Sequence, residues 1–277
     1  MRIVVMPGDG IGPEIVASTL QVLRRVDARF GLGLAFEDHE IGFASLENHG
    51  TTFRAEVLDA CRAADGILLG PLSHLDYPPR VQGGINVSGE LRIVLDLYAN
   101  VRPSRSREGL RHWGRTPMDL VVVRENTEGF YADRNMHVGI GEFMPSPDLA
   151  LSVRKITAKA SRRIAVSAFE LARKRRRKVT AVHKQNVLKI SDALFLREVR
   201  EVASGFGDVA YEEQLVDSMA AMLVRDAARF DVVVTTNMFG DILSDEAAEL
   251  SGSLGLAGSI NAGERHCMAQ AQHGSAP

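Results

Sequence analysis

The chain has 277 residues, of which 45% are hydrophobic and 25% charged, and its formal net charge is -2. This composition fits a globular protein of one large or two modest domains. The near-neutral charge gives no general attraction to nucleic acid or to an anionic membrane. No run of residues approaches the roughly 18 apolar positions of a membrane span. Cys61 and Cys267 form no metal or redox spacing, and the N-terminus has no signal-peptide pattern, so we expect a cytoplasmic protein with reduced thiols.

Short apolar runs alternate with helix-patterned stretches along the chain. The first run, residues 2–6 (RIVVM), leads through a glycine turn into residues 13–30, where apolar residues recur every three or four positions. The later runs are GILLG (66–70), DLVVVRE (119–125), KVTAVHK (178–184) and DVVVTTN (231–237). Buried strands that alternate with helices predict an α/β fold with a large, mostly parallel mixed sheet.

The glycine turn PGDGIGPE, residues 7–14, lies between the first strand and the first helix. Its glycines are spaced G-x-G-x-G, whereas the dinucleotide fingerprint is G-x-G-x-x-G, although Glu37 and Asp38 stand where a ribose-binding acid is expected. We interpret it as a structural turn rather than an ordinary Rossmann site.

Two segments depart from the strand–helix rhythm. Residues 131–148 are rich in glycine and proline and have no helical period, so they form either an excursion that pairs with another subunit or a plain surface loop. Residues 171–179 contain a basic run, which is typical of a helix C-terminus because cations complement the helix dipole. Nucleic-acid binding is disfavoured there because no aromatic residue is interleaved.

Three arginines lie near the ends of predicted elements. Arg92 is in a helical stretch, Arg102 follows the strand-like YAN, and Arg124 ends the run 119–125. Guanidinium groups in such places can hold carboxylates through two hydrogen bonds, although an arginine considered alone is more often part of a surface salt bridge.

Lys184 follows a strand and stands beside Asn186, where a lysine can take part in proton transfer or remain a solvated side chain. Tyr131 is a possible proton donor or a half-buried aromatic residue. Asp217 and Asp241 can cap or stabilise helix starts. Asp245 is four residues beyond Asp241, and like charges at this spacing cost roughly 0.2–0.5 kcal/mol. A shared Mg²⁺ or Mn²⁺ would offset that repulsion.

Six ordered segments, spread over nearly the whole chain, together resemble the isocitrate and 3-isopropylmalate dehydrogenase family: PGDGIGPE, LDLYANVRP, VRENTEGFY, HKQNVLK, NMFGDILSDEAAEL and HGSAP. The resemblance implies oxidation of a 3-substituted malate, a 2-hydroxy acid, by NAD or NADP, followed by loss of the 3-carboxylate as CO₂. NAD is the expected cofactor and NADP is the alternative.

The resemblance also implies roles for individual residues. The substrate would contact six of them: Arg92, Arg102, Arg124, Asn86, Ser88 and Asn186. The metal ion, Mg²⁺ or Mn²⁺, would be held by Asp217, Asp241 and Asp245. Lys184 would assist removal of the hydroxyl proton, and Tyr131 would protonate the enolate formed on decarboxylation. Lys184 and Asp217 would come from the partner subunit of a homodimer with shared active sites.

The cofactor would contact the first glycine turn, the final strand–helix junction and the end of the chain, at Ile11, Asn237, His273, Gly274, Ser275, Ala276 and Pro277. The first, cofactor-side domain would combine residues 1–99 and 252–277, and the second, residues 100–251, would carry the dimer interface and metal site. The active site is expected in a cleft between the domains.

The substrate's 3-substituent is expected to face Asn86, Ser88 and Gly89, which match neither the isopropylmalate nor the isocitrate pattern. A polar wall favours a polar or small substituent, and we expect isocitrate or homoisocitrate before 3-isopropylmalate, with tartrate and malate left open. Because the family continues beyond HGSAP, we expect the chain to be truncated at its C-terminus, and a non-catalytic or regulatory subunit is an alternative. An ordinary Rossmann dehydrogenase without metal is another.

Overall fold

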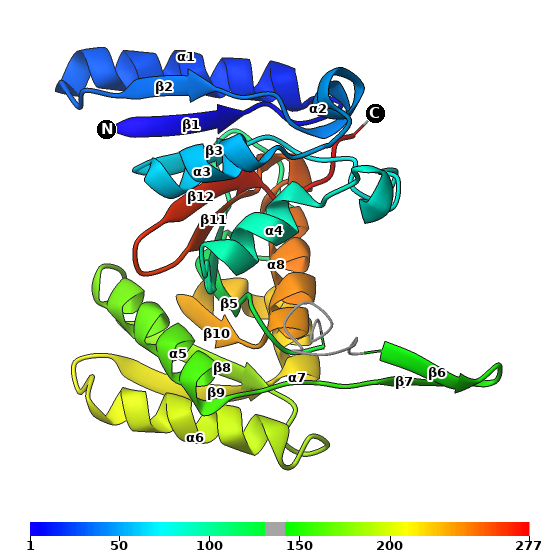
Figure 1. Cartoon of the computed structure of the whole chain (residues 1–277). Helices are drawn as coiled ribbons and strands as arrows, with labels where there is room; N and C mark the ends of the chain where they lie inside the picture. The colour runs from blue at the N-terminus through cyan, green and yellow to red at the C-terminus, as the bar shows by residue number, and fades with distance from the viewer. Residues whose placement is uncertain (131–141, 277) are drawn as a thin grey trace. The chain divides into compact units, whose positions relative to one another are not determined.

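The computed structural model describes residues 1–130 and 142–276. The chain forms two compact units, Met1–Leu97 with Gly258–Pro277, and Tyr98–Ala257 (Figure 1). The boundaries expected from the sequence lie at residues 99 and 252. Each unit has its own strands, helices and buried core, so each is described by itself.

The first unit is built on strands in the order β2-β1-β3-β12-β11. Strand β1 is parallel to β2 and β3, β3 is parallel to β12, and β12 is antiparallel to β11. The strands are β1 (Arg2–Met6), β2 (Ala35–Asp38), β3 (Gly66–Leu69), β11 (Gly258–Ala262) and β12 (Cys267–Ala271). The helices are α1 (Gly12–Phe30), α2 (Gly42–His49), α3 (Ala55–Ala63) and α4 (Val87–Val94), with a 3₁₀ turn at η1 (Arg80–Gln82).

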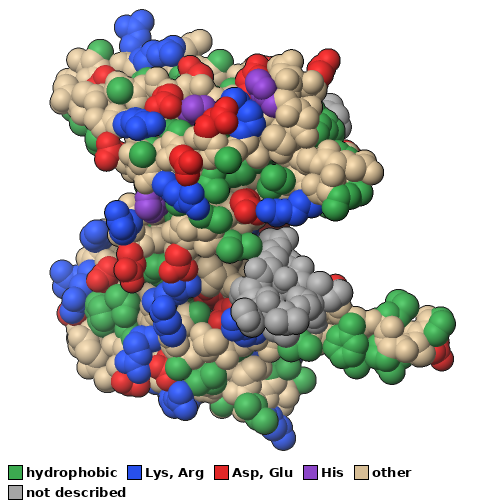
Figure 2. All heavy atoms as spheres, viewed as in Figure 1, with side chains coloured by type: hydrophobic (Ala, Val, Ile, Leu, Met, Phe, Trp, Pro, Cys, Tyr) green, Lys and Arg blue, Asp and Glu red, His purple; other side chains and the backbone are tan. Residues whose placement is uncertain are grey.

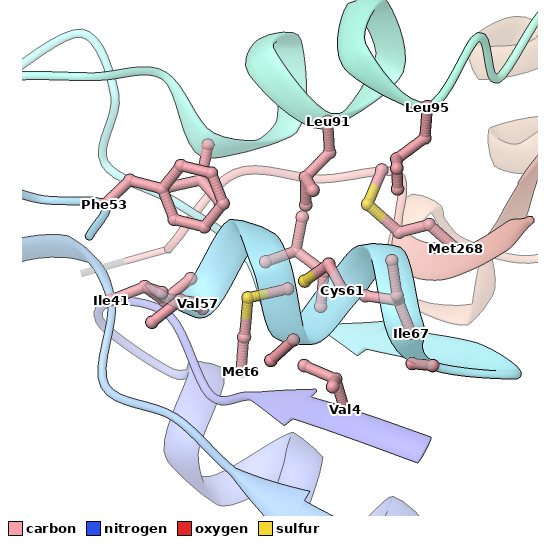
Figure 3. Close-up of a cluster of buried hydrophobic side chains, with 14 of the residues drawn as sticks. Val4, Met6, Ile41, Phe53, Val57, Cys61, Ile67, Leu91, Leu95 and Met268 are labelled. Atoms are coloured by element: carbon pink, nitrogen blue, oxygen red, sulfur yellow. The ribbon is translucent and has the colours of Figure 1, made fainter. Parts of the chain in front are cut away.

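Helix α4 is held against the core of this unit by its apolar face. Leu91 of α4 and the following Leu95 point towards α3, Leu95 beside Met268 (Figure 3), and both belong to one buried cluster with Val57 and Cys61. Residues 88 and 92 are four apart and therefore lie in one row along the helix, beside the row of Leu91 and Leu95. Packing of Leu91 thus fixes the direction in which Ser88 and Arg92 are presented.

The second unit has strands in the order β4-β5-β10-β8-β9. Strand β4 is antiparallel to β5, and the remaining neighbours are parallel. The strands are β4 (Ala99–Arg105), β5 (Asp119–Glu125), β8 (Lys178–His183), β9 (Ala210–Leu215) and β10 (Val232–Thr235). The helices are α5 (Ala158–Arg173), α6 (Ser191–Ser204), α7 (Val216–Asp226) and α8 (Asn237–Ser251), with 3₁₀ turns η3 (Ala227–Arg229) and η4 (Leu254–Leu256).

A separate antiparallel hairpin, β6 (Glu142–Ser146) with β7 (Leu149–Ser152), also belongs to the second unit. Its hydrophobic side chains are exposed (Figure 2), namely Phe143, Met144, Leu149 and Leu151. The hairpin covers the last part of the irregular segment 131–148, while residues 131–141 lie outside the described residues.

The predicted α/β fold with a mostly parallel sheet is confirmed. The five apolar runs form β1, β3, β5, β8 and β10, and the helix expected over 13–30 is α1. Helix α5 ends at Arg173, within the basic run, and Arg173 and Arg175 pair with Asp208 and Asp231. Among the described residues, no helix combines the length and the apolar character needed to cross a bilayer.

The glycine turn after β1 is held by the carboxylate of Asp9, which is 7% exposed. Asp9 accepts hydrogen bonds from the backbone N–H of Phe43 at 2.9 Å and of Ser73 at 3.0 Å, and from the hydroxyl of Tyr77. Burial, aided by this bond to Asp9, raises the pKa of Tyr77 and keeps the hydroxyl protonated as a donor. Gly8 has φ +79, and a Cβ there would lie 2.2 Å from the carbonyl oxygen of Pro71. These contacts support a structural turn.

Replacing Asp9 by alanine is expected to lower the free energy of unfolding by about 3 kcal/mol, because buried donors lose a charged acceptor. Asp9→Asn retains one acceptor oxygen and is expected to lose less. Urea denaturation of the two variants measures both values. A loss below about 0.5 kcal/mol for Asp9→Ala would show that the turn does not depend on this carboxylate.

Candidate functional site

Two buried arginines and two aspartates form a charged cluster in the second unit. Arg102 is on β4 and Arg124 on the neighbouring β5, and each is 4% exposed. Asp241 and Asp245 are on α8, which follows β10, the other neighbour of β5. The pairing of β4, β5 and β10 therefore brings the arginines to the face of α8 that carries both carboxylates.

Hydrogen bonds and ion pairs connect all four side chains. Arg102 Nη1 lies 3.3 Å from Asp241 Oδ1 and 3.1 Å from Asp245 Oδ1, and it donates to Ser244 Oγ at 2.7 Å. Arg124 Nη1 also donates to Asp241 Oδ1. The repulsion between the two aspartates is thus offset by guanidinium groups of the same chain.

Asp241 and Asp245 lie within α8, beyond its N-cap, and both are partly exposed. Helix α8 begins at Asn237 with Thr236 at its N-cap, so Asp241 is beyond the first turn and the capping interpretation is wrong. Desolvation raises the pKa of Asp245, the nearby Arg102 opposes this shift, and Asp241 adds to it. The side chains of Asp241 and Asp245 are 36% and 51% exposed, so both carboxylates can be reached from solvent.

Asn237 orients Arg124 through a buried amide. Its Nδ2 donates to the carbonyl oxygen of Glu128 at 2.9 Å, and its Oδ1 accepts from Arg124 Nε at 2.8 Å. Gly240 lies against the same guanidinium stem, where a Cβ would come within 2.7 Å of Arg124. The sequence suggested a cofactor contact for Asn237, and its role towards Arg124 had no signal in the sequence because both partners are distant along the chain.

Two further residues support Arg102 and were not predicted. Asn100 is fully buried on β4, and its Oδ1 accepts from Arg102 Nε at 2.5 Å. Ser244 lies between the two aspartates on α8 and also accepts from Arg102. A serine between two acidic residues on one helix is the only sequence hint of this arrangement.

Lys184 and Asp217 form a second charged pair in the same unit. Lys184 Nζ donates to Asp217 Oδ1 at 2.5 Å, and the two side chains are 26% and 62% exposed. This hydrogen bond is the main cause that lowers the pKa of Asp217. The N-cap of α7 is Leu215, so the capping interpretation of Asp217 is also wrong. Asn186 is exposed in the turn after Lys184.

The single chain does not collect the three predicted metal ligands. Within residues 1–130 and 142–276, no three His, Cys, Asp or Glu side chains lie together as a metal site. Asp241 and Asp245 are together on α8, and Asp217 is in another pair. This separation is consistent with the expectation that Asp217 serves a site on a second subunit.

In the first unit, the start of α4 carries the residues expected to face the substrate. Asn86 is the N-cap, and its Oδ1 accepts from Gly89 N at 3.1 Å. Ser88 Oγ donates to Oε1 of Gln270, on β12, at 3.0 Å. Arg92 lies one turn beyond Ser88. Gln270 was not predicted, since it is 182 positions from Ser88 along the chain.

The expected cofactor residues of the first unit come from both ends of the sequence. The N–H of Ile11 donates to the carbonyl oxygen of Ser275 at 2.9 Å, and Ser73 Oγ donates to Ser275 Oγ at 2.6 Å. Ser275 is 9% exposed. The segment with His273, Gly274 and Ala276 therefore docks on the glycine turn, while Pro277 and the proposed acid Tyr131 lie outside the described residues.

A buried acidic loop follows β5. Glu125 accepts from the N–H groups of Thr127 and Glu128, and Glu128 accepts from the N–H and the hydroxyl of Thr157, the N-cap of α5. Burial raises the pKa of Glu125. It also raises the pKa of Glu128 to about 7, with a further contribution from the charge of Glu125 and opposition from the Thr157 bonds. This loop supplies the carbonyl that holds Asn237.

Comparison with known proteins identifies extensive similarity. Residues 2–277 match the family model of isocitrate/isopropylmalate dehydrogenases. The 3-isopropylmalate dehydrogenase of Saccharolobus solfataricus is 40% identical over 276 residues, which cover 99% of this chain and 76% of that protein. The 3-isopropylmalate dehydrogenase of Archaeoglobus fulgidus is 41% identical, with 99% and 78% covered. The crystal structure of isocitrate dehydrogenase from Methylococcus capsulatus matches with a TM-score of 0.86 and 41% identity, covering 100% of this chain and 78% of that one.

The raised pKa of Glu128 predicts a stability that depends on pH. The pKa of this carboxyl is 4.5 in its ordinary state and about 7 in the folded protein. Between these two pH values the folded protein binds more protons at Glu128 than the unfolded chain does. The free energy of unfolding therefore falls as pH rises through this window. As the pH rises from 4.5 to 7.5, we expect the free energy of unfolding of Glu128→Gln to increase by on the order of 2 kcal/mol relative to that of the unmodified protein.

Urea denaturation of the two proteins across this range measures the difference, and titration of all other groups cancels between them. Glu56→Gln, at an exposed position, is the matched control. Parallel stability curves for Glu128→Gln and the unmodified protein would contradict the assignment.

Proposed function

Because the chain belongs to the isocitrate/isopropylmalate dehydrogenase family, we propose that it oxidatively decarboxylates a 3-substituted malate with NAD and Mg²⁺ or Mn²⁺. Membership of this family makes it an oxidoreductase that acts on a CH–OH donor. The observation that carries the proposal is the cluster of Arg102, Arg124, Asp241 and Asp245. Buried guanidinium groups beside accessible carboxylates suit an acid substrate that is bound together with a cation. NADP is the alternative cofactor.

Arg102 and Arg124 are proposed to hold carboxylates of the substrate, together with Arg92 of α4. Both cluster arginines are already fixed before substrate arrives, Arg102 by Asn100 and Ser244, and Arg124 by Asn237. Fixed donors lose little conformational freedom on binding, so the substrate is oriented at low entropic cost. Ser88, Asn86 and Asn186 are the remaining proposed substrate contacts.

The metal ion would be held by Asp241 and Asp245 with Asp217 of the partner subunit. The residues fit the group, because two solvent-accessible carboxylates one helical turn apart offer hard oxygen ligands while leaving room for water and substrate oxygens. A bound Mg²⁺ or Mn²⁺ supplies Lewis-acid polarisation of the substrate hydroxyl and carboxylate.

The proton transfers are assigned to Lys184 of the partner subunit and Tyr131. Lys184 would take the hydroxyl proton as the C2 hydrogen leaves with its electron pair, which turns the alcohol into a ketone. The electrons of the C3–carboxylate bond then form an enolate as CO₂ leaves, and Tyr131 returns a proton to C3. The hydrogen bond between Lys184 and Asp217 keeps the Lys184 nitrogen beside a proposed metal ligand, and Lys184 would accept the hydroxyl proton in its neutral amine form.

The cofactor is proposed to contact Ile11, Asn237 and residues 273–277, where NAD supplies the hydride acceptor. The docking of Ser275 on Ile11 supports this, because it brings the loop of residues 273–276 to the carboxyl end of β1, where α/β folds bind ligands. The first domain would then be the cofactor side and the second would carry the metal site and dimer contacts.

A homodimer with shared sites is proposed, and two features support it. Asp217 is apart from the other two acids within one chain, and the β6–β7 hairpin exposes Phe143, Met144, Leu149 and Leu151. Exposed apolar side chains on a hairpin are typical of an interface with another chain.

The free thiols of Cys61 and Cys267 support a cytoplasmic location.

A tartrate- or malate-type dehydrogenase of the same family is the second candidate, favoured by the small side chains at Ser88 and Gly89. A non-catalytic subunit is the third candidate. The chain retains the residues to which the family resemblance assigns a chemical role, and this argues against a non-catalytic subunit.

The proposed activity is tested by following NADH formation and CO₂ release with Mn²⁺ and isocitrate, homoisocitrate, 3-isopropylmalate or tartrate. Activity with one of these acids is expected to disappear with a chelator and to return with Mn²⁺. Asp241→Asn and Asp245→Asn are expected to lower kcat/KM at least 100-fold, because each removes the negative charge of a proposed metal ligand and of its ion pair with Arg102. Activity that survives the chelator would remove the metal from the proposal.

Shared sites predict that two inactive variants restore each other. Lys184→Met and Asp245→Asn are each expected to be inactive as homodimers. In a co-expressed mixture, one of the two sites in each heterodimer has neither substitution, so about a quarter of the unmodified activity is expected. Lys184→Met mixed with Asp217→Asn is the matched control, since both changes lie in the same contributed pair and no restored site forms. Absence of recovery in the first mixture would place Lys184 in the site of its own chain.

A further inference from the structure

The segments that follow three neighbouring parallel strands, β5, β10 and β8, all contact one arginine of the second unit, either directly or through its ion-pair partner. This residue, Arg154, lies between β7 and α5, and its side chain is 7% exposed. Its Cζ atom lies 5.5 Å from the ring centre of Phe130, in the loop after β5, and 5.4 Å from that of Phe239, in the first turn of α8. Aromatic rings attract a cation, so these two contacts help to fix the guanidinium group.

The polar atoms of Arg154 join the starts of α6 and α8. Arg154 Nη1 donates to Oδ1 of Asp192 and, at 2.8 Å, to Oγ of Ser191, both in the first turn of α6. Its Nη2 donates to Oγ1 of Thr236, the N-cap of α8, at 3.0 Å. The side chain of Asp192 is fully buried. An ion pair at this depth is tolerated because each charge has the other as its partner.

The second oxygen of Asp192 holds the main chain of Lys184. Asp192 Oδ2 accepts from the N–H of Lys184 at 2.5 Å. The carbonyl oxygen of Lys184 accepts from the N–H groups of Val187 at 2.9 Å and Leu188 at 2.8 Å. The backbone of Lys184 is therefore held at both its N–H and its carbonyl group, and freedom is left mainly to its flexible side chain.

Asp192 uses both of its oxygens as acceptors, because a backbone N–H and a guanidinium group can only donate. Asparagine has one oxygen and an NH₂ group, so it would leave either the Lys184 N–H or Arg154 without its acceptor. The carboxylate also balances the buried charge of Arg154. Aspartate is therefore suited to this position for two reasons, and one of them is the backbone of Lys184.

We propose that Asp192, held by Arg154, is a positioning residue that fixes the point from which Lys184 reaches the partner subunit's site. The inference rests on the proposed function, in which Lys184 of a chain serves one site of the homodimer and Asp241 and Asp245 of that chain serve the other. A change at Asp192 is therefore expected to harm mainly the site that receives Lys184 from the changed chain. Proton removal depends on alignment, so a displacement of about 1 Å lowers kcat on the order of 100-fold. The substrate KM changes little, because the residues proposed to hold substrate and metal stay in place.

The experiment uses heterodimers that retain one complete site. One chain carries Asp245→Asn and lends Lys184, and the other carries Lys184→Met and supplies the metal-binding aspartates. The two chains are co-expressed with different tags, and Asp192→Asn is added to one chain or to the other. In the lending chain it is expected to lower kcat on the order of 10- to 100-fold, with KM changed by less than about threefold. In the other chain kcat is expected to stay within about threefold of the value without the change.

Two double variants of the lending chain keep the test decisive if Asp192→Asn alone prevents folding. Arg154→Met is combined with Asp192→Asn or with Asp192→Leu, so neither protein has an unpaired buried charge. The asparagine offers an oxygen to the Lys184 N–H and the leucine offers none. We expect kcat at least about tenfold lower with leucine, at a similar KM, and melting temperatures confirm that both proteins are folded. Arg173→Met, which breaks an exposed ion pair with Asp208, is the matched control and is expected to leave kcat within about threefold.

Equal losses of kcat in the two placements of Asp192→Asn would show a general structural role, and equal kcat in the two folded double variants would show that the acceptor has no effect. Either result would overturn the role of Asp192 and leave the proposed activity standing. If the heterodimer without any change at Asp192 is inactive, the shared sites of the proposed function fail, and the inferred asymmetry fails with them.

Discussion

The charged cluster of the second unit depends on one constraint, the burial of two guanidinium groups beside two carboxylates on one helix. Arg102 and Arg124 are each 4% exposed, and a buried cation is tolerated only with partners of opposite charge. Asp241 and Asp245 supply those partners from the accessible face of α8. The aspartates repel each other in isolation, but with the arginines they form a set whose charges nearly balance. The cluster can bind a metal cation beside the aspartates and an acid substrate beside the arginines, because the charges of the two ligands also balance.

The same constraint explains several residues that hold no charge. Asn100 and Ser244 accept hydrogen bonds from Arg102, and Asn237 accepts one from Arg124 Nε. Asn237 is itself held by the carbonyl of Glu128, in a loop ordered by the carboxylate of Glu125. Gly240 leaves the space that the stem of Arg124 fills. Each contact removes freedom from a guanidinium group, so the direction of the arginines is set by the fold before any ligand binds.

The sequence predicted β1, β3, β5, β8 and β10 because each contains an apolar run that is mostly buried, and such a run can be recognised without knowing its partner strands. It missed β11 and β12, whose sequences GSINA and CMAQA acquire strand structure from pairing with each other. Asp217 and Asp241 were open to interpretation as helix caps because helix starts cannot be located to one residue from pattern alone. The Ser88–Gln270 contact had no sequence signal, because it joins residues 182 positions apart.

The start of α4 is fixed by two side-chain hydrogen bonds. Asn86 caps the start of α4, where its Oδ1 accepts from the N–H of Gly89. Ser88, two residues later, donates to Oε1 of Gln270 at 3.0 Å and so joins the start of α4 to β12. The relatives are named for isopropylmalate and for isocitrate at about 40% identity, so overall similarity does not separate the substrates.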